Sequence, residues 1–146
     1  MINAQTAYKG KGDMKVQVGG NFQSGASGLN LTYDQGIGEN MSIGLAATYL
    51  LSENVKDLAF EYRADVRARF NANIGKVLTL PDNIDVYPGL SLGLKNFGAH
   101  LGARYFFSDG FGLYTEAGFP IAKYNSDAIV GVNNQFNFNV GISFNL

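Results

Sequence analysis

Few residues of this 146-residue chain could perform chemistry, because it has no cysteine and only one histidine, His100. A cysteine–histidine nucleophile pair is therefore impossible, and no histidines and carboxylates cluster with the spacing of a transition-metal site. His100 could serve a lipid-modifying enzyme of the serine–histidine–carboxylate type, but no neighbouring segment offers a recognisable partner set. We therefore interpret His100 as a hydrogen-bonded interior side chain, and we predict that the protein is not an enzyme and binds no cofactor and no metal.

The densest group of charged residues lies in one short segment. Glu61 with Arg63, and Asp65 with Arg67 and Arg69, could be interpreted as an acid–base pair with cationic helpers. These charges alternate with apolar residues, as they would on the polar face of one strand. The element that carries them therefore decides between a catalytic and a structural interpretation.

Strands carry these charges, because hydrophobicity alternates with a period of two from Met14 to the C-terminus. Turn residues such as Ser108-Asp109-Gly110 separate the alternating segments, and their regular spacing predicts an up-and-down antiparallel sheet of eight strands. The expected strands cover residues 14–22, 29–34, 41–49, 60–71, 84–94, 98–107, 111–119 and 134–146.

Two places break the alternation. Residues 72–83 place several apolar residues ahead of Pro81, and their spacing predicts one short helix in this connection. Pro88 falls on the apolar face of the fifth expected strand, where it removes a hydrogen-bond donor from the ladder. We expect a bulge, a strand start or a locally open edge at Pro88.

The charged residues indicate which face of the sheet is inside. Those within strands all lie on the polar face, together with eight glycines and all four arginines of the chain. Exclusion of charge from the apolar face is expected of a soluble core, and equally of a membrane barrel, where a lipid-facing Arg or Lys costs about 2 to 4 kcal/mol at the midplane. The charged members of the polar face are Lys15, Asp34, Glu61, Arg63, Asp65, Arg67, Arg69, Asp85, Arg104 and Glu116.

The character of both faces favours the membrane barrel. A narrow lumen needs small residues beside long ones, and arginines paired with carboxylates keep buried charge satisfied. On the apolar face, aromatic residues gather toward both strand ends, as in the girdles of membrane barrels. One expected girdle holds Tyr33, Phe70, Tyr105, Phe107, Phe111 and Phe144, and the other holds Phe22, Tyr49, Phe60, Phe97, Phe119 and Phe136. The expected luminal ion network is Glu61, Arg63, Asp65, Arg67, Arg69, Asp85, Arg104 and Glu116.

The C-terminal strand ends in a pattern that resembles the β-signal of outer-membrane proteins. Asn139, Gly141, Phe144 and Leu146 occupy its polar, glycine, hydrophobic and final hydrophobic positions, with Leu where Phe is common. Together with segments 82–90 and 97–118, this pattern makes the chain similar to the small eight-stranded outer-membrane barrels of the OmpX/OmpW-like group in Bacteroidetes. The resemblance implies a bacterial outer-membrane location, contact with outer-membrane lipid and recognition by the assembly machinery. That group has no single shared activity.

We therefore expect an all-β fold, an eight-stranded antiparallel up-and-down transmembrane β-barrel over residues 14–146, with both termini periplasmic. Residues 1–13 would be a solvated N-terminal lead-in, of which residues 1–4 are either the remnant of an export signal or an ordinary N-terminus. We expect no nucleic-acid partner, because a net charge of −1 is not that of a chain with the strongly basic surface that nucleic acids bind.

The expected role is structural or accessory, as a subunit docked to another outer-membrane protein, because the connections expected outside the cell are short for a surface receptor. The ion network, with Tyr87, His100, Phe106 and Tyr114, should plug the lumen. The alternative is a narrow channel for small or hydrophobic solutes.

Overall fold

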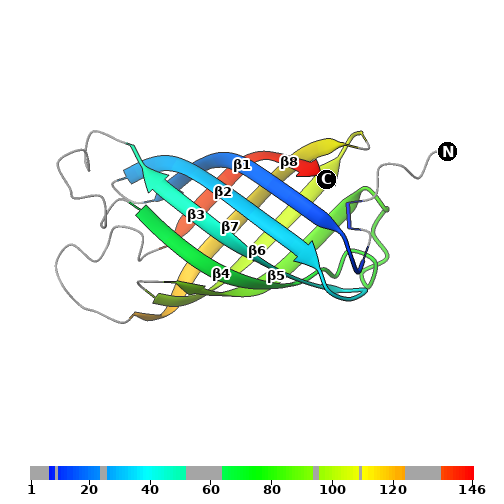
Figure 1. The fold of residues 1–146 in the computed structure, drawn as a ribbon, viewed down its shortest axis with the longest axis horizontal. Helices are drawn as coiled ribbons and strands as arrows, with labels where there is room; N and C mark the ends of the chain where they lie inside the picture. Colours follow the sequence, from blue (N-terminus) through cyan, green and yellow to red (C-terminus); the bar gives the residue numbers. More distant parts are fainter. Residues whose placement is uncertain are drawn as a thin grey trace.

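Eight antiparallel strands close into one barrel in the computed structural model (Figure 1), which confirms the expected fold class. The structure describes residues 7–8, 10–23, 26–51, 64–93, 96–108, 110–123 and 136–146. The strands are β1 (Met14–Gln23), β2 (Ala26–Gly36), β3 (Met41–Leu50), β4 (Ala64–Ala72), β5 (Ile84–Gly93), β6 (Asn96–Phe106), β7 (Phe111–Lys123) and β8 (Asn137–Asn145). No described residue belongs to a helix long and apolar enough to cross a membrane.

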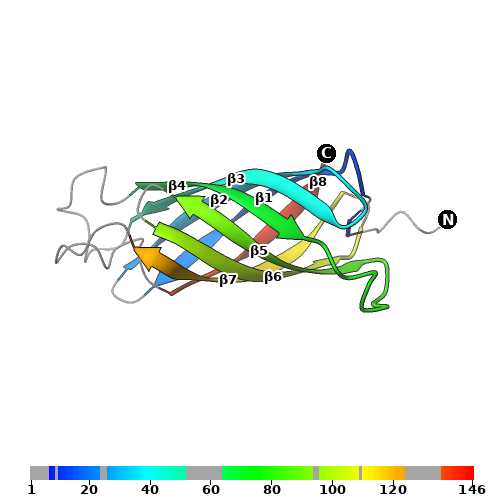
Figure 2. The same cartoon turned by 90° about the horizontal axis from the view of Figure 1, so that it is seen from below.

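The seam between the first and last strands closes the barrel. β1 and β8 pair in unbroken register from Lys15↔Asn145 to Gln23↔Asn137. In both views the strands run obliquely to the long axis (Figures 1 and 2), as barrel closure requires. We call the end where β1 begins and β8 finishes the terminal end, and the end where β1 finishes and β8 begins the loop end.

The burial pattern is the reverse of a soluble protein's. Large apolar side chains such as Leu45 and Leu92 are 58% exposed on the outer wall, whereas Arg104 is 1% exposed and Asp34 is 2% exposed inside. Aromatic side chains including Phe22, Phe119 and Phe144 project outward toward the strand ends. The wall is therefore suited to hydrocarbon and the interior to polar contacts.

The residues before β1 differ from the solvated lead-in that the sequence predicts. Ala7, Tyr8 and Asp13 are buried, because the segment folds across the terminal end of the barrel. Ala7 N–H donates to the Asp82 carbonyl at 2.8 Å, on the far side of this mouth. Gly10 and Gly12 adopt φ of 98° and 89°, which turns the chain back toward β1 at positions where only glycine is unstrained. Composition alone indicated solvation, but it could not reveal this docking.

The expected helix within residues 72–83 is also wrong. Residues 75–79 form a single turn, in which Leu78 N–H donates to the Ile74 carbonyl at 3.0 Å. Thr79 then adopts a left-handed φ of 58°, so the helical path stops after one turn. One turn fixes many dihedrals for a single hydrogen bond and does not propagate.

Both strand prolines lie where the ladder is interrupted. The β4–β5 pairing stops at Asn71↔Gly89, one residue short of Pro88. Of the three alternatives expected at Pro88, the structure therefore shows the locally open edge. β7 continues past its expected end to Lys123, because the β6–β7 register shifts beside Pro120. A bulge accommodates a proline that a regular ladder would exclude.

Candidate functional site

Two arginines in the lumen share one carboxylate. Arg69 Nε lies 3.0 Å from Asp34 Oδ1, and Arg104 Nη2 lies 2.9 Å from Asp34 Oδ2. Arg69 also donates to Glu116 with both terminal nitrogens, from Nη1 to Oε1 at 3.0 Å and from Nη2 to Oε2 at 2.8 Å. Arg104 Nη1 lies 3.5 Å from Asp85 Oδ2. We call these five residues the central ion network. All are buried, with exposed fractions of 1 to 6%, and bidentate pairing is the geometry that best satisfies an arginine away from water.

Tyr87 fills the space beside this network. Its hydroxyl donates to Glu116 Oε2 at 3.0 Å, and the Arg104 guanidinium lies 3.9 Å from its ring centroid. Arg104 Nε donates to Gln17 Oε1 at 2.6 Å. Gly102 gives the ring room, because a Cβ at that position would overlap it. The tyrosine therefore joins the network through a hydrogen bond and a cation–π contact.

The structure brings together four of the eight residues predicted for the network: Arg69, Asp85, Arg104 and Glu116. Asp65 and Arg67 form a separate ion pair nearer the loop end, and Glu61 and Arg63 lie outside the described residues. The sequence placed Asp34 on the polar face but left it out of the network. Alternation identifies the side on which a residue lies, whereas partners on distant strands depend on register and stagger, which alternation does not determine.

His100 lies in a second hydrogen-bonded cluster. Its Nδ1 is 2.8 Å from Ser91 Oγ, and its Nε2 is 2.5 Å from Asn71 Oδ1. Asn71 in turn donates to Ser42 Oγ at 3.1 Å. The third member of the serine–histidine arrangement is thus an amide, which cannot stabilise an imidazolium as a carboxylate does.

The polar hollow beside His100 is small. This vestibule, about 40 Å³ in volume, lies toward the loop end and is lined by residues that include Asn21, Asp65, Arg67, His100 and Asn139. A water molecule needs roughly 10 to 15 Å³, so the vestibule has room for a few waters. It is too small for an acyl substrate to reach Ser91.

The N-terminal segment makes the contacts at the terminal end. Tyr8 donates its hydroxyl to the carbonyls of Gly38 at 2.7 Å and Met41 at 2.5 Å. Burial, together with the charge of Asp13, raises the pKa of Tyr8 to about 12. Lys15 Nζ lies 2.6 Å from Asp13 Oδ2. The hydrogen bonds of Ala7 and Tyr8 thus cross the mouth, and the ion pair joins two residues at the start of β1.

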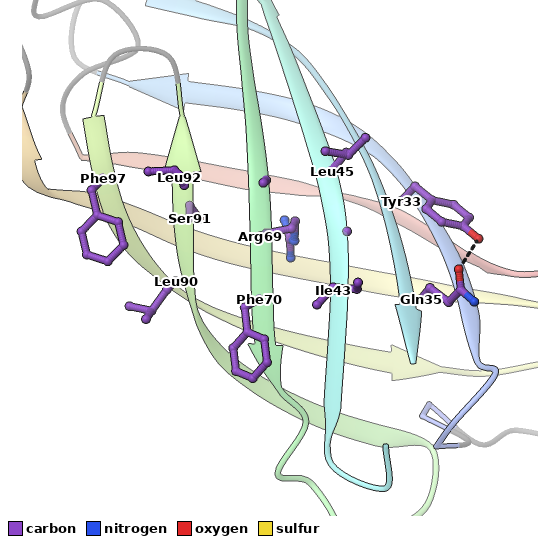
Figure 3. A pocket seen from close by; sticks show the side chains of 12 residues that line it. Tyr33, Gln35, Ile43, Leu45, Arg69, Phe70, Leu90, Ser91, Leu92 and Phe97 are labelled. Carbon is purple, nitrogen blue, oxygen red and sulfur yellow. Dashed lines mark hydrogen bonds between the residues drawn. The ribbon is translucent and has the colours of Figure 1, made fainter. Parts of the chain in front are cut away.

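A much larger hollow lies on the outer wall. This outer groove, about 600 Å³ in volume, crosses β2 to β6, and Figure 3 shows it from close by. Its walls are made by side chains that include Tyr33, Ile43, Leu45, Phe70, Leu92 and Phe97. Arg69 and Ser91 also line it, although their side chains are buried in the lumen.

The predicted assembly-signal residues divide between the two faces. Asn139 points inward and accepts a hydrogen bond from Asn21 Nδ2 at 2.7 Å. Gly141 faces Gly19 across the closing seam, where a Cβ on Gly141 would overlap the β1 backbone. Phe144 and Leu146 are exposed on the outer wall. Gly141 thus has a packing role in the seam, and recognition by the assembly machinery stays a prediction.

Comparisons with known proteins give a family and a fold. The model of the family described as "Family of unknown function (DUF6646)" matches residues 1–146. No curated protein matches. A solved structure described as "De novo design of transmembrane beta-barrels" is similar with a TM-score of 0.61 at 12% identity, covering 94% of this chain and 98% of that chain. At this identity the likeness shows the fold alone, which is that of a transmembrane β-barrel.

Proposed function

The chain belongs to the DUF6646 family, and we propose that it is an integral barrel of a bacterial outer membrane with a structural or accessory role. The transmembrane-type fold and the exposed apolar wall support the membrane location. The C-terminal pattern that ends at Leu146 supports the outer membrane in particular, and with it a likeness to the OmpX/OmpW-like barrels of Bacteroidetes. Both termini would face the periplasm.

Packing inside the barrel is the observation that carries this proposal. The central ion network and Tyr87 occupy the middle of the lumen, and Phe106 and Tyr114 are buried beside them. Within the part of the chain that the structure describes, the vestibule beside His100 holds a few waters, whereas the outer groove is far larger. An eight-stranded barrel has little interior to spare, so these side chains favour a plugged lumen over a pore.

A plugged barrel can act through its outer wall and its ends. Phe136 and Phe138 are 58% and 41% exposed and could contact a neighbouring outer-membrane protein. Phe60 and Tyr62, expected to join them, lie outside the described residues. We propose that the protein catalyses no reaction and binds no cofactor. We also propose that it binds no nucleic acid, because its net charge is −1.

The rival function is a narrow channel for small or hydrophobic solutes, which the vestibule at the loop end favours. Conductance of the purified barrel in a planar bilayer separates the two. The accessory role predicts no steady current from the wild-type protein, and recovery of a stoichiometric partner when native membranes are extracted in mild detergent. A steady current that Arg67→Ala alters, with no partner recovered, would establish the channel instead.

A further inference from the structure

The outer groove follows the pairing of five strands. Phe97, Leu92 and Ala68 are successive cross-strand neighbours, and Leu45 and Tyr33 continue the same row. This row runs perpendicular to the strands, along one wall of the groove. Since β6 begins near Phe97 at the loop end and β2 nears its finish at Tyr33, the groove descends from the loop end toward the terminal end.

A second row forms the opposite wall. Leu90, Phe70, Ile43 and Gln35 are neighbours across β5, β4, β3 and β2. Between the two rows lies a row of inward-facing residues, so the floor of the groove is mostly backbone. The hollow deepens at Ala68, because this small side chain stands between Leu45 and Leu92, which are both large and exposed.

The groove is apolar along its length and polar at one end. The wall side chains visible in Figure 3 are aliphatic or aromatic from Phe97 to Ile43. At the opposite end the Tyr33 hydroxyl donates to Gln35 Oε1 at 3.5 Å, so the two N–H groups of the Gln35 amide can donate to a ligand. An aromatic hydroxyl and an amide beside an apolar groove suit the boundary between hydrocarbon and headgroups.

We propose that the outer groove is a binding site for one glycerophospholipid of the leaflet nearest the terminal end. One acyl chain lies in the groove over Ala68, and an ester or phosphate oxygen accepts a hydrogen bond from the Gln35 side-chain amide, whose oxygen is held by the Tyr33 hydroxyl. The inference rests on the proposed function, since only a barrel in a bilayer meets such a ligand.

The dimensions of the groove fit this occupant. Five strands span four interstrand spacings, so the groove is about 19 Å long, and it runs obliquely to the barrel axis because the strands are tilted. A volume of about 600 Å³ falls in the range of small-ligand pockets. An apolar groove with a polar end matches a phospholipid, which joins an acyl chain to a polar headgroup. A second apolar hollow on the wall, of about 420 Å³ beside Leu31 and Val66, is smaller.

Filling the hollow tests the site. The full-length protein is refolded into vesicles of equal parts phosphatidylethanolamine and phosphatidylglycerol, extracted in mild detergent, and examined by native mass spectrometry for retained phospholipid. We expect the wild type to retain one phospholipid, and Ala68→Phe to lower the retained fraction about fivefold or more. The matched control is Ala103→Phe, on the outward face of β6 but away from the groove, which should retain lipid as the wild type does.

Two results would overturn the site. Retention by Ala68→Phe equal to the wild type would show that the groove is not used, and equal loss from Ala103→Phe would show that the lipid is general annular lipid. A heat-dependent shift in gel mobility verifies that each variant is folded, and Gln35→Leu, which leaves the hollow open, should also lower retention. If the wild type did not insert into vesicles at all, the proposed membrane function would be rejected as well. If the barrel folds and inserts but the wild type and Ala68→Phe retain phospholipid equally, only the lipid site is rejected.

Discussion

Arg69 holds two carboxylates of the central ion network. It contacts Asp34 and Glu116, and its removal leaves two buried carboxylates short of a partner. Loss of one partner from a buried ion pair commonly costs about 3 to 5 kcal/mol. We therefore predict that Arg69→Ala markedly lowers the temperature at which the folded barrel changes its mobility on a gel.

Arg67 provides the matched comparison. Its side chain is 17% exposed, because it lines the vestibule where water can reach it. Arg67→Ala should lower the transition temperature much less than Arg69→Ala, although both remove one arginine from β4. Equal, small effects of both substitutions would mean that water reaches the whole lumen and that the network is not buried.

Gly102 makes room for Tyr87, a large side chain that crosses the lumen. A Cβ at Gly102 would overlap the Tyr87 ring, which is itself held against Arg104. Overpacking of this kind costs about 1 to 3 kcal/mol, so Gly102→Ala should reduce stability in urea titrations of the refolded protein. Gly110→Ala, where a Cβ meets nothing within 4 Å, should change stability little. Similar midpoints for both variants would argue against tight packing around Tyr87.

The N-terminal segment is the element that covers the terminal end, and Tyr8 anchors it. The pKa of Tyr8 in the folded protein is raised to about 12 from a usual value near 10. The protonated Tyr8 hydroxyl therefore stabilises the fold fully below pH 10, and this contribution is lost as the pH rises through about 12. Tyr8→Phe lacks both hydrogen bonds and should be less stable than the wild type at pH 7.

The pH dependence of that difference is the measurement. Thermal unfolding of wild type and Tyr8→Phe should give transition temperatures that converge between pH 10 and about 12, since only the wild type has the Tyr8 hydroxyl. A difference that stays constant over this range would show that the Tyr8 hydroxyl does not hold the segment in place.

The strands were the most predictable elements of this protein. A period of two is set by the pleat, and it gave eight strands whose inward and outward residues could be sorted from the sequence. The segment after β4 was predicted wrongly as a short helix. A few apolar residues at helical spacing are also compatible with a single turn, and here the left-handed conformation of Thr79 ends that turn. The end of β7 was missed because Pro120 usually ends a strand, and only pairing with β6 reveals the bulge.

At the scale of the whole molecule, the sequence predicted which charges are inside but not how they pair. Asp34 on β2 reaches Arg69 on β4 and Arg104 on β6, and these contacts cross the barrel rather than join neighbouring strands. Their geometry depends on the tilt and stagger of closure, which local periodicity does not encode. The docked N-terminal segment is a further long-range feature of this kind.

Cysteine accessibility tests the central claim, that a plugged barrel spans a membrane, most directly. The chain has no native cysteine, so each substitution gives a unique thiol. For the protein refolded in vesicles, we predict that the Leu45→Cys thiol does not react with a charged maleimide, that a fluorophore attached to it before refolding is quenched by lipid-borne quenchers, that Gln17→Cys does not react with the charged maleimide, and that Gly110→Cys does. Labelling of Leu45→Cys by the charged reagent would contradict the membrane-spanning wall, and labelling of Gln17→Cys by it would contradict the plugged lumen.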